Sequence, residues 1–207
     1  MQITEFLRLV SGEPGRVVSR NVRHASTQTL EEASRPGGIS LKDLMDAPPA
    51  RTEQKLIRYG HVLGPPASPQ TIEAWCRNRP SYPLPPDLRA LVEHTNGIHL
   101  WANLETGRSY EGLAPMEEWD LARAKMPRSL LDERYMALTY HQDGASLVVV
   151  DLVSAKYYLM DVAGPDTSTP IGGTASDLLD WLWKSRIAPN SQTYPTACVS
   201  PRGSKGP

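Results

Sequence analysis

Residues 135–162, YMALTYHQDGASLVVVDLVSAKYYLMDV, decide the fold class. Three runs rich in β-branched and aromatic residues lie within this stretch: 135–140, 146–152 and 157–162. Short turn segments around Gly144 and Ala155 separate the runs. Because connections this short join antiparallel neighbours, the stretch predicts an antiparallel meander of strands. Gly164-Pro165 closes the meander, and residues 170–173 are compatible with a short edge strand.

Two helices are predicted before the meander. Ser68 and Pro69 supply an N-cap and a first-turn proline for the first helix. Leu88, Leu91 and Val92 lie on the buried stripe of the second, which Asn96-Gly97 ends. The segments between these helices and the meander predict two strands and a short helix, at residues 98–102, 110–113 and 115–122.

A helix is also predicted after the meander. Thr174 and Asp177 match a capping box, and the apolar residues that follow predict a helix buried over much of its circumference. Together these elements predict a common core that includes Trp75, Leu88, Leu91, Trp119, Leu147, Val149 and Leu182. We therefore expect a single α+β domain over residues 61–188, in which an antiparallel meander sheet packs against helices.

The two flanks carry weaker signals. Residues 1–60 are interpreted as an N-terminal extension without a core of its own, although the apolar residues between Ile3 and Val10 predict one short helix or strand. Leu41, Leu44 and Met45 have the spacing of a second short helix. Residues 189–207 consist mainly of Pro, Ser, Thr and Gly, which is typical of a disordered tail.

The charge is unevenly distributed along the chain. The net charge of the whole chain is −1, but residues 87–180 carry −8, whereas residues 1–86 carry +3 and residues 181–207 carry +4. An acidic region repels phosphates and attracts a basic protein surface. The charge therefore argues against nucleic acid as a partner and favours a basic protein. The alternative interpretation is a charged surface that serves only solubility.

The sequence predicts neither membrane insertion nor export. The longest apolar run, residues 147–150, is far shorter than the roughly 20 residues of a transmembrane helix. The N-terminus contains Glu5 and Arg8 and lacks the apolar region of a signal peptide. Cys76 and Cys198 fall in a predicted helix and in the predicted tail, which is typical of free thiols in a reducing compartment. We therefore expect a cytoplasmic protein that does not bind a membrane.

No residue pattern predicts catalysis, a metal or a cofactor. His94 and His99 flank the Asn96-Gly97 turn, and a metal site would need a third ligand beside them. His141 and Asp143 have the residue types of a base and its orienting acid, but their place favours hairpin-turn chemistry. The chain also lacks a phosphate-binding loop and a nucleophile elbow. The sequence therefore predicts a protein that is not an enzyme.

The order of several short motifs carries a further signal. Trp75 in a capped helix is followed by the pattern Leu-Pro-x-x-Leu at residues 84–88, and the second helix ends in Asn96-Gly97. A strand then leads to LAPMEEW at residues 113–119, and the apolar helix SDLLDWL closes the series at residues 176–182. In this order the motifs resemble the SUKH superfamily, which is named for yeast regulators of cell-wall synthesis.

The resemblance covers about residues 68–186 and implies an immunity protein. Most bacterial members look like proteins that neutralise a toxin encoded by a neighbouring gene. Such toxins are frequently nucleases delivered by contact-dependent or type VI secretion systems. A nuclease needs a basic surface to hold phosphates, and the acidic central region would complement such a surface.

We therefore predict that the protein covers the active surface of a cognate basic toxin. The predicted contacts are acidic side chains on loops and on the short helix: Glu105, Glu111, Glu117, Glu118, Asp120, Asp132 and Glu133. Asp151 and Asp161 are left out because they lie in or beside predicted strands. One alternative is a regulatory or scaffolding module of the same fold that binds another protein, and another is an enzyme that uses His141 and Asp143.

Overall fold

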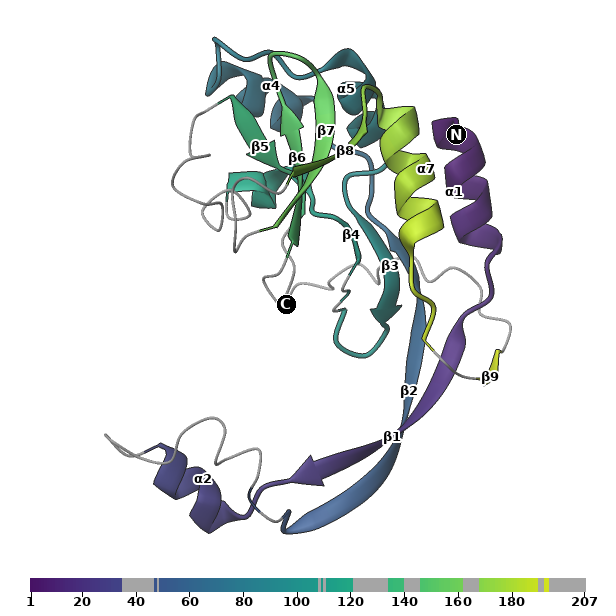
Figure 1. The fold of residues 1–207 in the computed structure, drawn as a ribbon, viewed down its shortest axis with the longest axis vertical. Helices are drawn as coiled ribbons and strands as arrows, with labels where there is room; N and C mark the ends of the chain where they lie inside the picture. The colour runs from purple at the N-terminus through teal and green to yellow at the C-terminus, as the bar shows by residue number, and fades with distance from the viewer. Residues whose placement is uncertain are drawn as a thin grey trace.

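The structure is a computed structural model that describes residues 1–34, 47, 49–107, 109, 111–120, 134–139, 146–161, 168–189 and 192–193. Its helices are α1 (Ile3–Gly12), α2 (Thr27–Ala33), α4 (Pro69–Arg77), α5 (Pro86–His94), the 3-10 helix η1 (Met116–Glu118) and α7 (Ala175–Ser185). Its strands are β1 (Arg16–His24), β2 (Arg51–Leu63), β3 (Ile98–Asn103), β4 (Glu111–Leu113), β5 (Tyr135–Ala137), β6 (Ser146–Asp151), β7 (Lys156–Asp161), β8 (Ser168–Gly172) and β9 (Gln192–Thr193). Helices together with antiparallel sheets confirm the predicted α+β fold (Figure 1).

The strands of the described residues form two antiparallel sheets. The second sheet has the order β5-β6-β7-β8, so neighbouring strands follow one another along the chain. This sheet is the predicted meander, with β6 and β7 paired along their whole length and the expected edge strand present as β8. The first sheet has the order β4-β3-β2-β1-β9 and includes strands from the region that we interpreted as an extension.

Apolar side chains from both sheets, from four α-helices and from η1 form one main core. Strand β6 is buried on both faces. Val148 and Val150 belong to the main core, whereas Leu147 and Val149 pack in a smaller cluster on the opposite face of the sheet. The residues that the sequence predicted to be buried are all buried: Trp75, Leu88, Leu91, Trp119, Leu147, Val149 and Leu182.

Two of the helices begin with the predicted caps. The Ser68 hydroxyl accepts a hydrogen bond from the Thr71 backbone N–H at 3.0 Å, and proline occupies the first turn of α4. At the start of α7, the Thr174 hydroxyl accepts from the Asp177 N–H, and the Asp177 carboxylate accepts from the Thr174 N–H. This reciprocal pair is the capping box that the sequence predicted.

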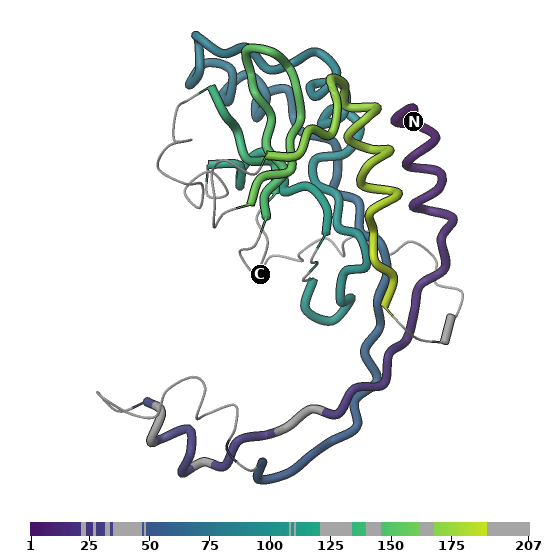
Figure 2. Tube along the Cα trace, viewed as in Figure 1, coloured from purple at the N-terminus to yellow at the C-terminus, as the bar shows by residue number. Residues whose placement is uncertain are grey.

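Helix α1 packs against α7, although the two lie at opposite ends of the sequence (Figure 2). Phe6 and Val10 of α1 are fully buried in the main core, and the Phe6 ring meets the Trp183 ring edge-on with centroids 6.2 Å apart. The apolar spacing near the N-terminus therefore forms a helix rather than a strand. Residues 1–60, which we interpreted as an extension, contribute this helix to the core, and β2 continues across residue 61.

Strands β1 and β2 extend beyond the rest of the first sheet. They pair with each other from Arg16↔Tyr59 to His24↔Arg51, whereas β2 pairs with β3 only from Tyr59 onward. Residues 17–24 and 51–58 therefore leave the body as a curved two-stranded ribbon that carries α2 at its far end (Figure 1). We call this ribbon the arm. The sequence did not predict these strands, and the expected short helix at residues 41–45 lies outside the described residues.

The predicted tail is described only in part. Pro189 lies at the end of the segment after α7, and residues 192–193 form β9 against the start of β1. The other residues of the expected disordered tail, including Cys198, lie outside the described part of the chain. Among the described helices, none combines the length and the apolar composition that crossing a membrane requires.

Candidate functional site

The predicted toxin-binding residues fall in three places. Glu117 and Glu118 belong to η1, and Asp120 follows them directly. Glu105 lies in the turn after β3, and Glu111 begins β4. Asp132 and Glu133 lie outside the described residues, as do His141 and Asp143. The described acidic residues therefore belong to three segments: residues 117–120 in and beside η1, Glu105 in the turn after β3, and Glu111 at the start of β4.

The Asn96 side chain fixes the position of η1 through two hydrogen bonds. Its amide nitrogen donates a hydrogen bond to the Glu117 carboxylate at 2.8 Å, and its amide oxygen accepts one from the Met116 N–H at 2.8 Å. Asn96 itself is 9% exposed, while Glu117 is exposed. The Asn-Gly pair that ends α5 therefore also fixes the position of one acidic side chain.

The Trp119 side chain anchors the other end of the short helix. Its indole N–H donates to the Ala114 carbonyl at 2.9 Å, and its ring meets the Trp75 ring of α4 edge-on at 5.9 Å. Trp119 is 2% exposed, so Glu118 and Asp120, its neighbours in the sequence, adjoin a buried aromatic residue. The short helix is thereby held between a buried amide and a buried indole.

Asp120 is exposed but forms an ion pair with Arg79. The Arg79 guanidinium is almost buried and lies 4.8 Å above the Trp75 ring. This ion pair compensates the charge of Asp120, whereas the exposed Glu117 carboxylate accepts its hydrogen bond from the neutral Asn96 amide. Sequence reasoning did not single out Arg79, because its aspartate partner lies about 40 residues away.

Glu105 and Glu111 are engaged within the molecule. Glu105 forms an ion pair with Lys55 of the arm at 2.7 Å. Both carboxylate oxygens of Glu111 accept from the Ile187 backbone N–H at 3.0 Å, which ties β4 to the segment after α7. Burial raises the pKa of Glu111 above its usual value. These contacts give Glu111 a structural role that its sequence context did not indicate.

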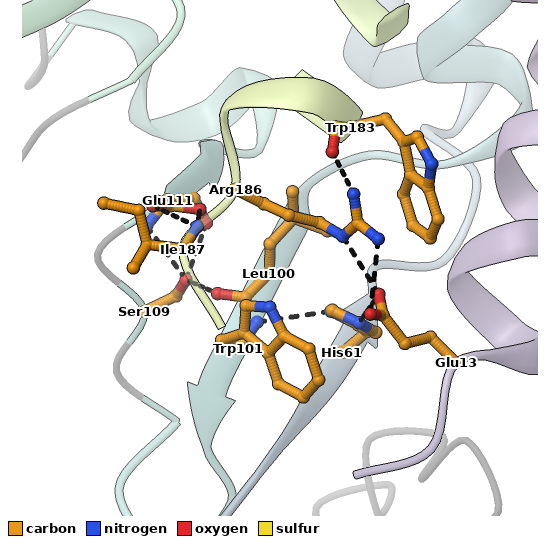
Figure 3. A network of polar contacts seen from close by, with 9 residues as sticks. All are labelled: Glu13, His61, Leu100, Trp101, Ser109, Glu111, Trp183, Arg186 and Ile187. Atoms are coloured by element: carbon orange, nitrogen blue, oxygen red, sulfur yellow. Dashed lines mark hydrogen bonds and ion pairs between the residues drawn. The ribbon is translucent and has the colours of Figure 1, made fainter. Parts of the chain in front are cut away.

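A buried polar network joins α1, β2, β3 and the segment after α7 (Figure 3). Nε2 of His61 lies 2.8 Å from the Glu13 carboxylate, and Nδ1 accepts from the Trp101 backbone N–H at 3.2 Å. Arg186 donates to the same carboxylate at 3.0 Å and stacks 3.3 Å from the Trp183 ring. Sequence reasoning missed this network, since its members are scattered along the chain without a motif.

His61 is too deeply buried to reach a substrate. Its side chain is 1% exposed, and burial lowers its pKa below the usual value, although the Glu13 carboxylate acts in the opposite direction. Trp101 adopts a φ of 50°, a conformation that costs a residue other than glycine about 1 kcal/mol. These contacts hold the base of the arm, where Arg16 lies 5.0 Å above the Trp101 ring.

A pocket of about 200 Å³ lies between β4, β6, β7 and α7. Its lining is mainly apolar, with Val148, Leu159 and Trp181 on the walls and Glu111 among its polar residues. Such a lining can hold the aliphatic part of a long cationic side chain with the charge beside the carboxylate. No group of three or more metal-ligating side chains was found in the part of the chain that the structure describes. No family model matches this chain, and no curated protein matches it either.

Proposed function

We propose that this protein is an immunity protein of the SUKH superfamily that binds and neutralises a cognate bacterial toxin. The toxin is of the nuclease type and is delivered by a contact-dependent or type VI secretion system. The observation that carries the proposal is the short helix η1, which presents Glu117 and Glu118 on a support of buried side chains. The order of the sequence motifs and the charge of −8 over residues 87–180 also support it.

The support of η1 matters because a binding surface loses affinity when its side chains must be ordered first. Asn96 already fixes Glu117, so a partner's cation meets a carboxylate whose position is set. A region of net negative charge also accelerates the encounter with a basic protein. A nuclease needs a basic surface to hold phosphates, and covering that surface inhibits it without any catalytic residue in the inhibitor.

The motif residues and the proposed surface are linked physically. Asn96 ends α5 and also holds Glu117, and Trp119 follows Glu118 directly and anchors it to the core. The same residues that carry the resemblance therefore position the carboxylates. In this proposal the protein acts in the cytoplasm, where an incoming nuclease would meet its substrate, and it catalyses no reaction.

The proposal predicts that removing two charges from η1 weakens protection. In the variant Glu117→Gln/Glu118→Gln, the glutamine oxygen at position 117 can still accept from Asn96, so the fold is expected to persist. We expect the association rate with the toxin encoded by the neighbouring gene to fall by about threefold to tenfold at low salt. Surface plasmon resonance measures this rate, and survival of cells that express both proteins measures protection.

The matched control is Glu5→Gln/Glu31→Gln, which removes two exposed carboxylates from α1 and α2. This control should associate at the rate of the wild-type protein. Equal protection by both double variants, with both folded, would refute the role of η1. Failure of the wild-type protein to bind the neighbouring toxin would refute the immunity proposal itself. Capture of a different protein partner would favour the regulatory or scaffolding alternative.

A further inference from the structure

The arm is strongly basic. Its residues 17–24 and 51–58 contain four arginines and one lysine but only one glutamate, Glu53. Arg20, Arg51 and Arg58 among these residues are exposed. In the described part of the chain, neither Arg20 nor Arg58 has an ion-pair partner. The basic charge of the arm is therefore only partly compensated within the molecule.

The arm also lacks the packing that stabilises a ribbon. Residues 51–56 of β2 are exposed at every position, so both faces of this part of the arm meet solvent. Leu56 on β2 is 63% exposed, and Leu30 on α2 at the tip is 51% exposed. An isolated two-stranded ribbon is only marginally stable in water. A partner that covers one face would add the missing contacts.

The register of the arm places two positive charges opposite each other. Arg20 lies directly opposite Lys55, and residues opposite each other in an antiparallel pair project from the same face. Two like charges in this position repel each other. Lys55 is balanced by Glu105, a carboxylate of the body, at 2.7 Å. A second carboxylate at the same face would balance the charge of Arg20 in the same way.

We propose that the arm of one copy binds the acidic body of a second copy, so that the protein forms a two-fold symmetric homodimer. The complementary charge is present in the same chain, because residues 87–180 carry a net of −8. The Lys55–Glu105 pair is an intramolecular example of the same contact. In a two-fold arrangement each arm contacts the other body, so the contact closes on itself.

A duplex nucleic acid is the other polyanion to consider, since a two-stranded ribbon fits the major groove. The acidic body would then lie beside the phosphates and repel them, whereas in the dimer it supplies the binding surface.

The area of the proposed dimer contact is large enough for a specific interface. One face of a ribbon eight residues long covers roughly 300 Å², so two reciprocal contacts bury on the order of 1,200 Å², the lower end of specific interfaces. This inference does not depend on the proposed immunity function.

Analytical ultracentrifugation of the full chain tests the inference. We expect a monomer–dimer equilibrium at 50 mM NaCl that shifts toward monomer at 500 mM NaCl, because salt screens exposed charges. The variant Arg20→Glu/Arg51→Glu, which reverses two exposed arginines on the same face of the arm, should raise the dimer dissociation constant at least about tenfold. The matched control Arg8→Glu/Arg77→Glu, which reverses exposed arginines outside the arm, should leave the constant within about twofold of the wild type.

Photo-crosslinking shows which surfaces meet. A benzophenone amino acid at the exposed position 53, in place of Glu53 on the face of Arg20 and Lys55, should give mixed-isotope crosslinks to residues 87–180 in an equal mixture of ¹⁴N- and ¹⁵N-labelled protein. The inference is overturned by a monomer at every concentration up to about 100 µM at low salt, or by a dimer that the arm variant leaves intact. Crosslinks from arm to arm would also overturn it. So would a monomer whose arm binds a fluorescent 20-base-pair duplex, because the arm would then be a nucleic-acid site.

Discussion

His61 lies where α1, β2, β3 and the segment after α7 meet, and both of its ring nitrogens are used. Because Nδ1 accepts from the Trp101 N–H, the proton of the neutral ring sits on Nε2 and points at Glu13. Burial favours this neutral form, which is why the pKa of His61 falls below its usual value. A protonated ring would lose the bond from Trp101 and place a charge in the buried junction.

The buried histidine predicts a pH dependence of stability. The unfolded chain binds a proton near pH 6.5, whereas folded His61 binds it only at lower pH. Its stabilising contribution is therefore complete above about pH 6.5 and is lost as the pH falls through that value toward the folded pKa. Urea unfolding at pH 7.5, 6.5 and 5.5 should show decreasing stability over this range.

The variant His61→Gln should have lower stability at pH 7.5 and a smaller decrease toward pH 5.5. His99 provides the comparison, because burial also lowers its pKa while the Glu118 carboxylate opposes the shift. His99→Gln should therefore reduce the pH dependence as well, but without loosening the base of the arm. Equal slopes for the wild type and His61→Gln would contradict the assignment of a neutral buried ring.

For single residues, the sequence showed which side chains are acidic but not which groups surround them. Glu111 and Glu117 looked alike in the sequence, since both are acidic residues on predicted surface segments. In the structure Glu111 accepts a backbone hydrogen bond from Ile187, whereas Glu117 is exposed and held by Asn96. Those partners lie 76 and 21 residues away, and one sequence contains no signal that pairs them.

The helices and the meander were predictable at the scale of elements because each has an apolar face with a regular period. Helix α7 is the clearest case, since its capping box and its buried residues Leu178, Leu179 and Leu182 lie within one short stretch. The strands β1 and β2 were not predictable, because residues 51–56 of β2 are exposed on both faces and the two strands have no regular alternation of apolar and polar residues. Their pairing also spans residues that lie outside the described part of the chain.

The capping box predicts a measurable loss when its hydroxyl is removed. Thr174→Ala deletes the acceptor of the Asp177 N–H and should lower the free energy of unfolding by about 1 kcal/mol. Thr174→Ser keeps an acceptor at the same position and should retain most of the stability. Thermal or urea unfolding of the three proteins checks this. A loss of the same size in the serine variant would show that the methyl group, and not the cap, matters.

At the scale of the whole molecule, α1 belongs to the same core as the predicted domain. Phe6 is fully buried and contacts Trp183, and Glu13 after α1 pairs with Arg186 after α7. The sequence predicted the apolar residues of α1 but not the element against which they pack. The spacing of a short helix shows that one side is apolar, but it carries no information on which distant element covers that side.

Removing the Phe6 ring tests this arrangement. Phe6→Ala leaves a cavity in the main core and should destabilise the protein by about 3–5 kcal/mol. The exposed Thr4 on the same helix is the control, and Thr4→Ala should change stability by less than about 0.5 kcal/mol. Tryptophan fluorescence and far-UV circular dichroism should give coincident unfolding transitions for all three proteins. A small loss in Phe6→Ala would mean that α1 docks only loosely.

The two helices α1 and α7 pack together but are synthesised far apart in time. A ribosome that has completed α1 does not reach the end of α7 until about 170 residues later. At roughly 5–20 residues per second, this interval lasts about 10–30 s. Throughout it, the side chains of Phe6 and Val10 lack the surface that finally covers them. The nascent chain therefore carries an unshielded apolar stripe throughout this interval, which makes its yield in cells sensitive to chaperone supply and to growth temperature.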